Sequence, residues 1–380
     1  MIAGTVKALL SGSLLCILAS CASEPPPVPP AELVPTTSEV TLVRLWSAKT
    51  GDAGRGRFEP WVGDNQLVVA NRRGKLTSLA RDNGMRQWSS ELDVRLTSGV
   101  GGSAEQIYVS DTNGMVHALN PGDGSVVWQS AGSSEILVPV AAGYGVAIVR
   151  STDGRIAALE PADGSERWTV SNTPPALTLN GYSRPLLLDG GVLVGLDDGR
   201  LLALNIDSGK LIWEAVLSVP SGRSEVERLV DIDADIVIDD EGIYVANYQG
   251  KAARLEPAQG QIVWSIPLSA GSGMALNEKH LVIVDDADTV HLLNKQTGQT
   301  IWTNDTMPGR RLSPPAFTSQ GDVILGDVGG YVHVLSASSG ASVGRTRLTD
   351  EPISARPYQA EDTVYVQATD GLVAAYRFAR

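Results

Sequence analysis

The sequence predicts an all-β fold, specifically an eight-bladed β-propeller of four-stranded blades whose ring is closed by an N-terminal strand. Three observations lead to this prediction. A repeat of about 40 residues fills the chain, its apolar residues alternate with period two, and no helix-period pattern follows the first twenty residues. One closed ring accounts for 380 residues without several separate domains.

The repeat is defined by glycine and tryptophan at fixed spacing. Each copy has an opening position, a glycine ten residues later and a tryptophan position four residues after that. The seven copies span residues 74–88, 114–128, 154–168, 199–213, 250–264, 288–302 and 330–344. Asp288 replaces the opening glycine of the sixth copy, and Gly344 replaces the tryptophan of the seventh.

Each copy contains the elements of a propeller blade in the same order. After the opening glycine, apolar residues alternate toward a leucine such as Leu79, as in a strand with one buried face. A turn such as "DNG" follows, and the next strand carries the tryptophan, whose large flat ring suits packing between sheets. Another strand precedes each opener. The structural tryptophans are Trp46, Trp88, Trp128, Trp168, Trp213, Trp264 and Trp302.

The two ends of the chain supply complementary halves of one further copy. An eighth copy opens at Gly371, but the sequence ends before its turn and tryptophan. The segment 40–49 contains Trp46 without a preceding half-repeat. We therefore expect this N-terminal strand to complete the last blade, which leaves no open terminal edge to pair with other chains.

The N-terminus predicts secretion and a lipid anchor. Residues 1–20 have the short charged start of a signal peptide, and their apolar centre at 9–19 is too short to span a bilayer comfortably. The stretch "LASC" at 18–21 resembles the bacterial lipobox, so Cys21 is expected to carry lipid after cleavage. An ordinary secretory signal with a chance cysteine is the alternative. Processing would leave no thiol for a disulfide, because Cys16 is the only other cysteine.

A proline-rich segment follows the predicted lipidation site. We predict that residues 21–38 comprise the lipidated cysteine and a polyproline II spacer, and that residues 39–380 form the propeller. At ~3.1 Å per residue, the spacer would reach roughly 50 Å. The net charge of −13 disfavours binding to nucleic acid or to anionic lipid surfaces.

The candidate metal ligands do not form a convincing site. His117, His291 and His333 occupy one repeat position on three different copies, which favours a structural role on strands over converging ligands. The stretch "DIDAD" at 231–235 resembles the start of a calcium loop, but Ile236 stands where that loop needs glycine. We predict no metal, no cofactor and no catalytic residue.

Two neighbouring copies carry insertions that predict a binding surface. The openers at 154, 199 and 250 are more widely spaced than the others, and the extra residues follow two outermost strands. Such loops lie on one face of a propeller and commonly bind partners. The sequence leaves open whether the leucines at 177 and 179 belong instead to a buried strand. The candidate partner-binding residues are Leu177, Leu179, Asn180, Arg184, Arg228, Asp231 and Asp233.

With its lipobox, proline spacer and eight glycine–tryptophan copies, the whole chain resembles the BamB family. The resemblance implies a lipid-anchored, non-catalytic scaffold on the periplasmic face of the outer membrane, within the β-barrel assembly (BAM) complex that folds and inserts outer-membrane proteins. Ala22 rather than aspartate after the cysteine agrees with sorting to that membrane. Unfolded outer-membrane proteins are further possible partners.

The resemblance also implies a partner for the inserted loops, namely a POTRA domain of the barrel-forming subunit BamA. Leu177 and Leu179 match the family's leucines, and Asp231 and Asp233 match its paired aspartates. We expect both aspartates to contact basic groups on BamA. Asn180 stands where the family has arginine, so Arg184 is expected to substitute for it. The glycine–tryptophan repeat alone is shared with PQQ-dependent dehydrogenases, which remain the alternative, and a generic periplasmic interaction platform is a third reading.

Overall fold

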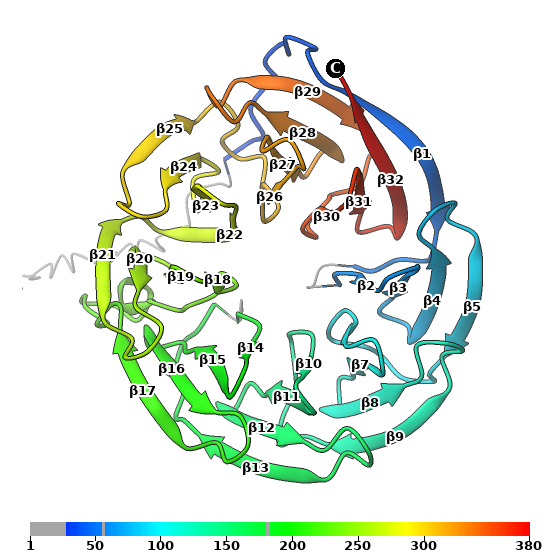
Figure 1. Cartoon of the computed structure of the whole chain (residues 1–380), viewed down its shortest axis with the longest axis vertical. Coiled ribbons are helices and arrows are strands. Elements are labelled where there is room, and N and C mark those ends of the chain that lie inside the picture. Colours follow the sequence, from blue (N-terminus) through cyan, green and yellow to red (C-terminus); the bar gives the residue numbers. More distant parts are fainter. Residues whose placement is uncertain (1–27, 55–57, 180–182) are drawn as a thin grey trace, which may run out of the picture.

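The computed structural model describes residues 28–54, 58–179 and 183–380. Within these ranges the strands form eight antiparallel sheets of four strands each. The sheets stand as blades around a central axis, with the first strand of each blade nearest the axis and the last at the rim (Figure 1). The predicted eight-bladed propeller is therefore confirmed.

The strands are grouped by their position within the blade, in blade order. The innermost strands are β2 (Trp61–Val62), β6 (Gly101–Gly102), β10 (Ala141–Gly143), β14 (Leu186–Leu188), β18 (Val237–Asp239), β22 (Ala270–Leu276), β26 (Ala316–Phe317) and β30 (Tyr358–Ala360). The second strands are β3 (Gln66–Ala70), β7 (Ile107–Ser110), β11 (Val146–Arg150), β15 (Gly191–Gly195), β19 (Gly242–Ala246), β23 (His280–Asp285), β27 (Val323–Gly326) and β31 (Thr363–Gln367).

The outer half of each blade is listed in the same order. The third strands are β4 (Lys75–Ala80), β8 (Met115–Leu119), β12 (Arg155–Leu159), β16 (Arg200–Asn205), β20 (Lys251–Leu255), β24 (Val290–Asn294), β28 (Tyr331–Leu335) and β32 (Leu372–Ala379). The outermost are β5 (Arg86–Glu91), β9 (Val126–Ala131), β13 (Glu166–Ser171), β17 (Leu211–Val216), β21 (Ile262–Pro267), β25 (Thr300–Asn304), β29 (Ser342–Arg347) and β1 (Thr41–Lys49). One short 3₁₀ helix, η1 (Val226–Arg228), lies between blades 4 and 5.

The ring closes through the N-terminal strand, as the two half-repeats predict. Strand β1 pairs antiparallel with β32 from Thr41 opposite Ala379 to Lys49 opposite Leu372. It is thereby the outermost strand of blade 8, beside β30, β31 and β32. No helix in the described residues is both long enough and apolar enough to cross a bilayer.

The core lies between neighbouring blades. All five residues of β11 are buried, because both faces of its sheet are covered by other sheets. Ile148 on blade 3 and Val194 on blade 4 belong to the same apolar cluster. Burial on both faces explains why the second strands are nearly continuous apolar runs rather than alternating ones.

Each repeat tryptophan fastens its blade to the next one. The indole Nε1–H of Trp128 donates to the carbonyl of Pro161 at 2.7 Å, and that of Trp168 to the carbonyl of Ile206 at 2.8 Å. The same ring covers the second glycine of the following repeat. A Cβ on Gly164 would lie 2.4 Å from Cε3 of Trp128, and its φ of +73° is one that glycine adopts readily. The glycine–tryptophan spacing therefore encodes the contact between blades.

A β-bulge precedes every tryptophan of the repeat. In blade 4, Leu204 pairs with Leu211 and Ala203 pairs with Trp213, so Ile212 is an extra residue. Corresponding register shifts occur in the other seven blades. As a result two consecutive side chains face solvent at the rim, and Leu211 and Ile212 are 56% and 53% exposed.

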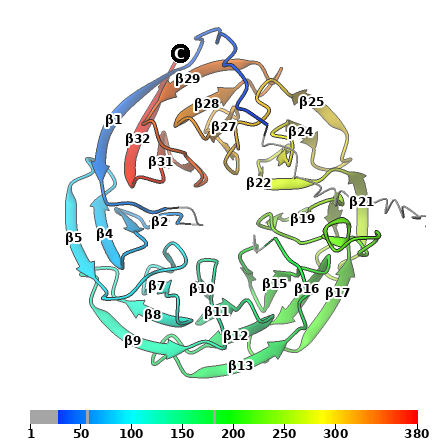
Figure 2. The same ribbon diagram turned by 180° about the vertical axis from the view of Figure 1, so that it is seen from behind.

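The connections divide between the two faces of the ring. Because strands alternate in direction, the outer-to-inner loops between blades share one face with the turns joining second and third strands. We call this the long-loop face, since it carries residues 172–185 and 217–236. The other face carries the turns that join first to second and third to fourth strands. Figure 2 shows the ring from the long-loop side.

Candidate partner-binding surface

The two inserted loops contact each other and form one unit. The backbone N–H of Leu179 donates to Oδ2 of Asp231 at 2.7 Å. Farther along, the N–H of Ser183 reaches the carbonyl of Ile232 at 3.3 Å. These bonds join segment 172–185, between blades 3 and 4, to segment 217–236, between blades 4 and 5. The prediction that the insertions project together from one face agrees with this arrangement.

Both loops of this unit carry exposed apolar side chains. Leu177 and Leu179 lie in a loop outside any strand, and each is 41% exposed. The alternative of a buried strand at these leucines is therefore wrong. Val219 and Val226 on the second loop are 71% and 58% exposed. Apolar residues grouped on one surface, with polar groups around them, are typical of a protein interface.

Around η1 the second loop is held by its own polar contacts. The carboxylate of Glu227 accepts N–H groups from Arg223 at 2.6 Å and Ser224 at 3.2 Å, which lowers the pKa of Glu227. Arg228 is exposed, and its guanidinium contacts the carbonyl of Gly222 at 3.2 Å and the carboxylate of Glu225 at 3.4 Å. Arg228 is thus placed at the surface, where a partner can reach it.

Asp231 departs from the prediction that it contacts a basic partner directly. Its exposure is 0%, and its carboxylate holds the backbone of Leu179. Burial raises its pKa to about 6 against the lowering effect of the Leu179 N–H, and the nearby Asp197 carboxylate adds to the rise. The sequence placed the right residue next to the surface but gave it the wrong role: Asp231 positions the first loop from beneath.

A buried ion pair lies within electrostatic reach of Asp231. Arg150, at the end of β11, and Asp197, in the turn after β15, are joined at 2.5 Å, and both are almost fully buried. Burial raises the pKa of Asp197, and the Arg150 guanidinium opposes that rise. Arg150 also lowers the pKa of Asp231, while Asp197 raises it. Charged groups from blades 3 and 4 therefore act on the aspartate that holds the first inserted loop.

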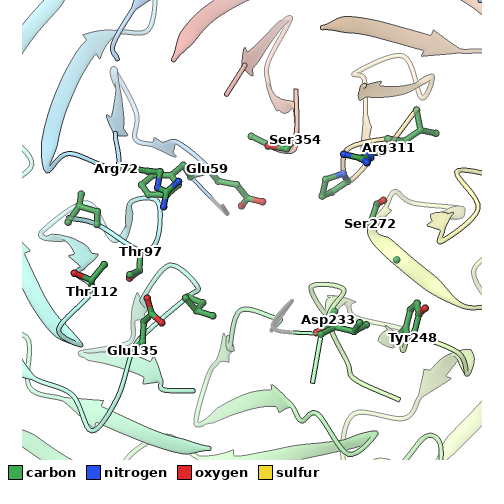
Figure 3. A pocket seen from close by; sticks show the side chains of 18 residues that line it. Glu59, Arg72, Thr97, Thr112, Glu135, Asp233, Tyr248, Ser272, Arg311 and Ser354 are labelled. Carbon is green, nitrogen blue, oxygen red and sulfur yellow. The ribbon is translucent and has the colours of Figure 1, made fainter. Parts of the chain in front are cut away.

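Asp233 faces the central axis, beside Leu179. It is partly exposed and lines a pocket of about 630 Å³ at the mouth of the ring (Figure 3). Glu59, Glu135, Arg72 and Arg311 line the same pocket, so its charge is mixed. That Asp233 contacts a basic group of a partner stays a prediction.

The side chain of Arg184 forms ion pairs inside the ring. Its guanidinium Nη2 donates to Glu59, which precedes blade 1, at 2.8 Å and lies 3.6 Å from Asp235. The pair with Glu59 crosses the central opening and the pair with Asp235 joins neighbouring blades 4 and 5, so Arg184 is not placed to substitute for a partner-binding arginine at position 180. Asn180 itself, like Cys21 and the signal peptide, lies outside the described residues.

The repeat histidines serve the blades. Each shares a hydrogen bond with an aspartate six residues earlier, at 2.9 Å for His117 with Asp111 and at 2.8 Å for His333 with Asp327. His291 with Asp285 repeats the arrangement at 2.9 Å. In the part of the chain that the structure covers, no three His, Cys, Asp or Glu side chains gather as a metal site would require.

Sequence reasoning missed several features of this surface. It named neither Val219 nor Val226, although "SVPSG" and "SEVER" place lone valines among polar residues, which is a weak sign of exposure. It also missed the buried ion pair between Arg150 and Asp197 near Asp231, because the two residues lie far apart in the sequence and share no motif. Their contact depends on blade order in space.

Comparisons with known proteins agree on the family. A family model described as "Outer membrane protein assembly factor BamB" matches residues 72–304 and 286–379. A protein of that name from Pseudomonas aeruginosa is 42% identical over 97% of this chain and 98% of its own length. The crystal structure of BamB from Moraxella catarrhalis superimposes with a TM-score of 0.82 at 23% identity, covering 88% of this chain and 99% of that one.

The fold by itself does not separate this chain from enzymes. A quinohemoprotein alcohol dehydrogenase from Comamonas testosteroni superimposes with a TM-score of 0.72, but at 13% identity and with 76% of its chain covered, which shows a shared fold alone. Matches in sequence along nearly the whole chain carry the assignment, and they are to assembly factors rather than enzymes. The chain belongs to the BamB family of outer-membrane protein assembly factors.

Proposed function

We propose that this protein is a non-catalytic scaffold of the BAM complex that binds a POTRA domain of BamA through the exposed apolar surface of its two inserted loops. It acts at the periplasmic face of the outer membrane, tethered through lipid on Cys21. The observation that carries the proposal is the pair Leu177 and Leu179, each 41% exposed on a loop whose backbone is fixed by Asp231. Pre-organised apolar anchors bind without a large ordering cost.

The surface is completed by the second loop. Val219 and Val226 extend the apolar area, and Arg228 supplies a charge at its edge. An apolar centre with a charged rim gives affinity through the leucines and specificity through the charge. Asp231 contributes by positioning Leu179, while Asp233 and Arg184 stabilise the mouth of the ring.

The test is a binding measurement between the purified propeller and the POTRA segment of BamA. The double variant Leu177→Asp with Leu179→Asp should weaken binding by about ten-fold or more, since two anchors at ~1 kcal/mol or more each are lost. A matched control is Leu211→Asp with Ile212→Asp, an apolar pair at the rim that is somewhat more exposed than the two leucines. Unchanged affinity in the leucine variant, or an equal loss in the control, contradicts the proposed surface.

A second role at the rim has its own support. The bulges expose apolar pairs on three outer strands, β9, β17 and β21, beside edges with no further strand in their sheets. Such edges can pair with extended chains, and barrel proteins awaiting insertion are chains of that kind. Here Leu211→Asp with Ile212→Asp should reduce capture of an unfolded barrel protein while keeping BamA binding. Retained capture would contradict this role.

The dehydrogenase alternative has a direct test. Adding PQQ with Ca²⁺ to the purified chain should give neither a saturable absorbance change nor alcohol oxidation, because the chain belongs to a family of assembly factors. Saturable binding with turnover would reverse that conclusion.

A further inference from the structure

The proline-rich segment does not all serve as a free spacer, because residues 28–40 lie along blade 7. We call these residues the strap. The N–H of Ala31 donates to the carbonyl of Pro308 at 2.9 Å, that of Thr37 to Ser342 at 3.2 Å and that of Val40 to Val343 at 3.0 Å. The strap therefore crosses the outer side of blade 7 from the long-loop face to the opposite face, where it leads into β1 (Figure 2).

The irregular seventh repeat is shaped to receive the strap. Gly344 stands at the tryptophan position, and a Cβ there would lie 2.5 Å from the carbonyl oxygen of Val40. In blade 8 the third strand β32 and the outermost strand β1 are not consecutive in the chain, so no turn joins them for a tryptophan to cover. The strap fills that place, and Val40 and Val343 are both buried in the cluster between blades 7 and 8.

The start of the strap is tied to a buried polar group of blade 7. Arg310 donates through Nη1 to the carbonyl of Ala31 at 2.8 Å and through Nε to Asp327 at 2.6 Å. Arg310 is 6% exposed and Asp327 is 0% exposed, and Asp327 also bonds His333. Gly309 lets the chain approach closely, since a Cβ on it would meet the carbonyl oxygen of Pro29 at 2.6 Å.

The path of the strap fixes where an N-terminal anchor leaves the disc. Pro308 and Arg310 lie in the loop between β25 and β26, on the long-loop face. Only seven residue steps separate Cys21 from Val28, which span at most about 25 Å when fully extended. A free spacer ending at Ser38 would instead start from the opposite face and reach roughly twice as far.

We propose that the strap is a built part of the propeller that carries the anchor point to the long-loop corner of blade 7, so that this corner faces the anchoring membrane. The inference rests on the proposed lipid on Cys21. It also places the membrane and the two inserted loops on the same face of the disc. The docked strap limits the distance from the lipid, whereas a free proline spacer would let either face approach it.

The test measures which side of blade 7 is nearer to lipid. The lipidated chain is reconstituted in vesicles containing a headgroup-labelled lipid, and a fluorophore is attached to Asp305→Cys on the long-loop face or to Ser339→Cys on the opposite face. Both sites are exposed, and lipidated mature protein has no other free thiol. Energy transfer should be higher from position 305. Equal transfer, or more from position 339, overturns the proposal.

A variant and a second readout isolate the strap. Gly344→Trp restores the repeat residue and should displace Val40. Energy transfer should then no longer be higher from position 305 than from position 339, and the amides of Ala31 and Thr37 should lose their protection from hydrogen exchange. Arg347→Trp puts the same ring on an exposed site of β29 and should keep both. If the amides of Ala31 and Thr37 exchange without protection in the unmodified chain, the strap is not docked on blade 7, and this result does not depend on whether Gly344→Trp folds. Failure of the chain to float with vesicles contradicts the lipid anchor instead.

Discussion

Replacing Asp231 separates a positioning role from a direct contact with the partner. Asp231→Asn keeps the size of the side chain and an oxygen that can accept the N–H of Leu179, but it removes the charge. Asp231→Ala removes both. If Asp231 acts from beneath the surface, Asp231→Asn should bind the POTRA segment like the unmodified chain, whereas Asp231→Ala should bind more weakly.

The structure sets the size of each effect. A hydrogen bond to a charged group contributes ~1.5–3 kcal/mol, so its loss in Asp231→Ala should speed exchange of the Leu179 amide by about ten-fold or more. The pKa of Asp231 rises from 3.8 to about 6, which corresponds to ~3 kcal/mol against the buried charge at neutral pH. In Asp231→Ala, removing the charge offsets much of the lost bond, so global stability should change little. Asp231→Asn keeps an acceptor for the Leu179 N–H and removes the buried charge, so it should be more stable than the unmodified chain at neutral pH.

The pH dependence of unfolding gives an independent check. A carboxyl whose folded-state pKa is raised binds its proton more tightly when folded, so its contribution favours folding below pH 3.8 and is lost as pH rises through about 6. Relative to Asp231→Asn, the unmodified chain should therefore gain stability in urea as pH falls from 7 to 4.

Binding and exchange should be measured on the same samples, with the Leu179 amide followed by hydrogen exchange. In Asp231→Asn we expect protection and affinity both retained, and in Asp231→Ala both reduced. Asp231→Asn losing as much affinity as Asp231→Ala, with Leu179 still protected, would refute the reasoning, because only the charge would then matter.

Two further substitutions test how the blades are held together. Gly164→Ala should lower the free energy of unfolding by about 1–3 kcal/mol more than Gly190→Ala. Both glycines have positive φ, but only the Cβ at position 164 collides with Trp128. Equal urea midpoints for the two variants would contradict the tryptophan–glycine contact. Asp327→Asn should lower the free energy of unfolding by about 3 kcal/mol, as measured by thermal melting, because it weakens a buried charged network. Burial raises the pKa of Asp327, but the hydrogen bonds from His333, Tyr331 and Arg310 outweigh burial and lower it. The stability that Asp327 contributes is therefore present above pH 3.8 and lost below, and the variant should lose less stability in acid. An acid sensitivity equal to that of the unmodified chain would count against this role.

The repeat made the architecture predictable because its residues report contacts that recur in every blade. Trp128 and Gly164 are spaced to meet across two blades, so the blade count and the closure by Trp46 followed from sequence. The bulge did not, because an extra residue in the outer strand, such as Ile212, leaves the spacing of the repeat unchanged.

The candidate surface was predictable in location but not in the roles of its residues. Wider repeat spacing located both loops, yet composition cannot tell an exposed leucine from a buried aspartate within an irregular loop. Leu179 is 41% exposed and Asp231 is 0% exposed, opposite to what their polarity alone would suggest. Likewise, Gly344 was visible as a break in the repeat, but its cause lies in a segment some 300 residues earlier in the chain.

We propose that this propeller works as a partner of BamA in the outer membrane. The most direct test is affinity purification of the full-length chain from solubilised outer membranes, with the companions identified by mass spectrometry. We expect BamA among them in amounts comparable to the chain, and a marked loss of BamA when Leu177→Asp and Leu179→Asp are combined. Recovery of the propeller without BamA would contradict this role.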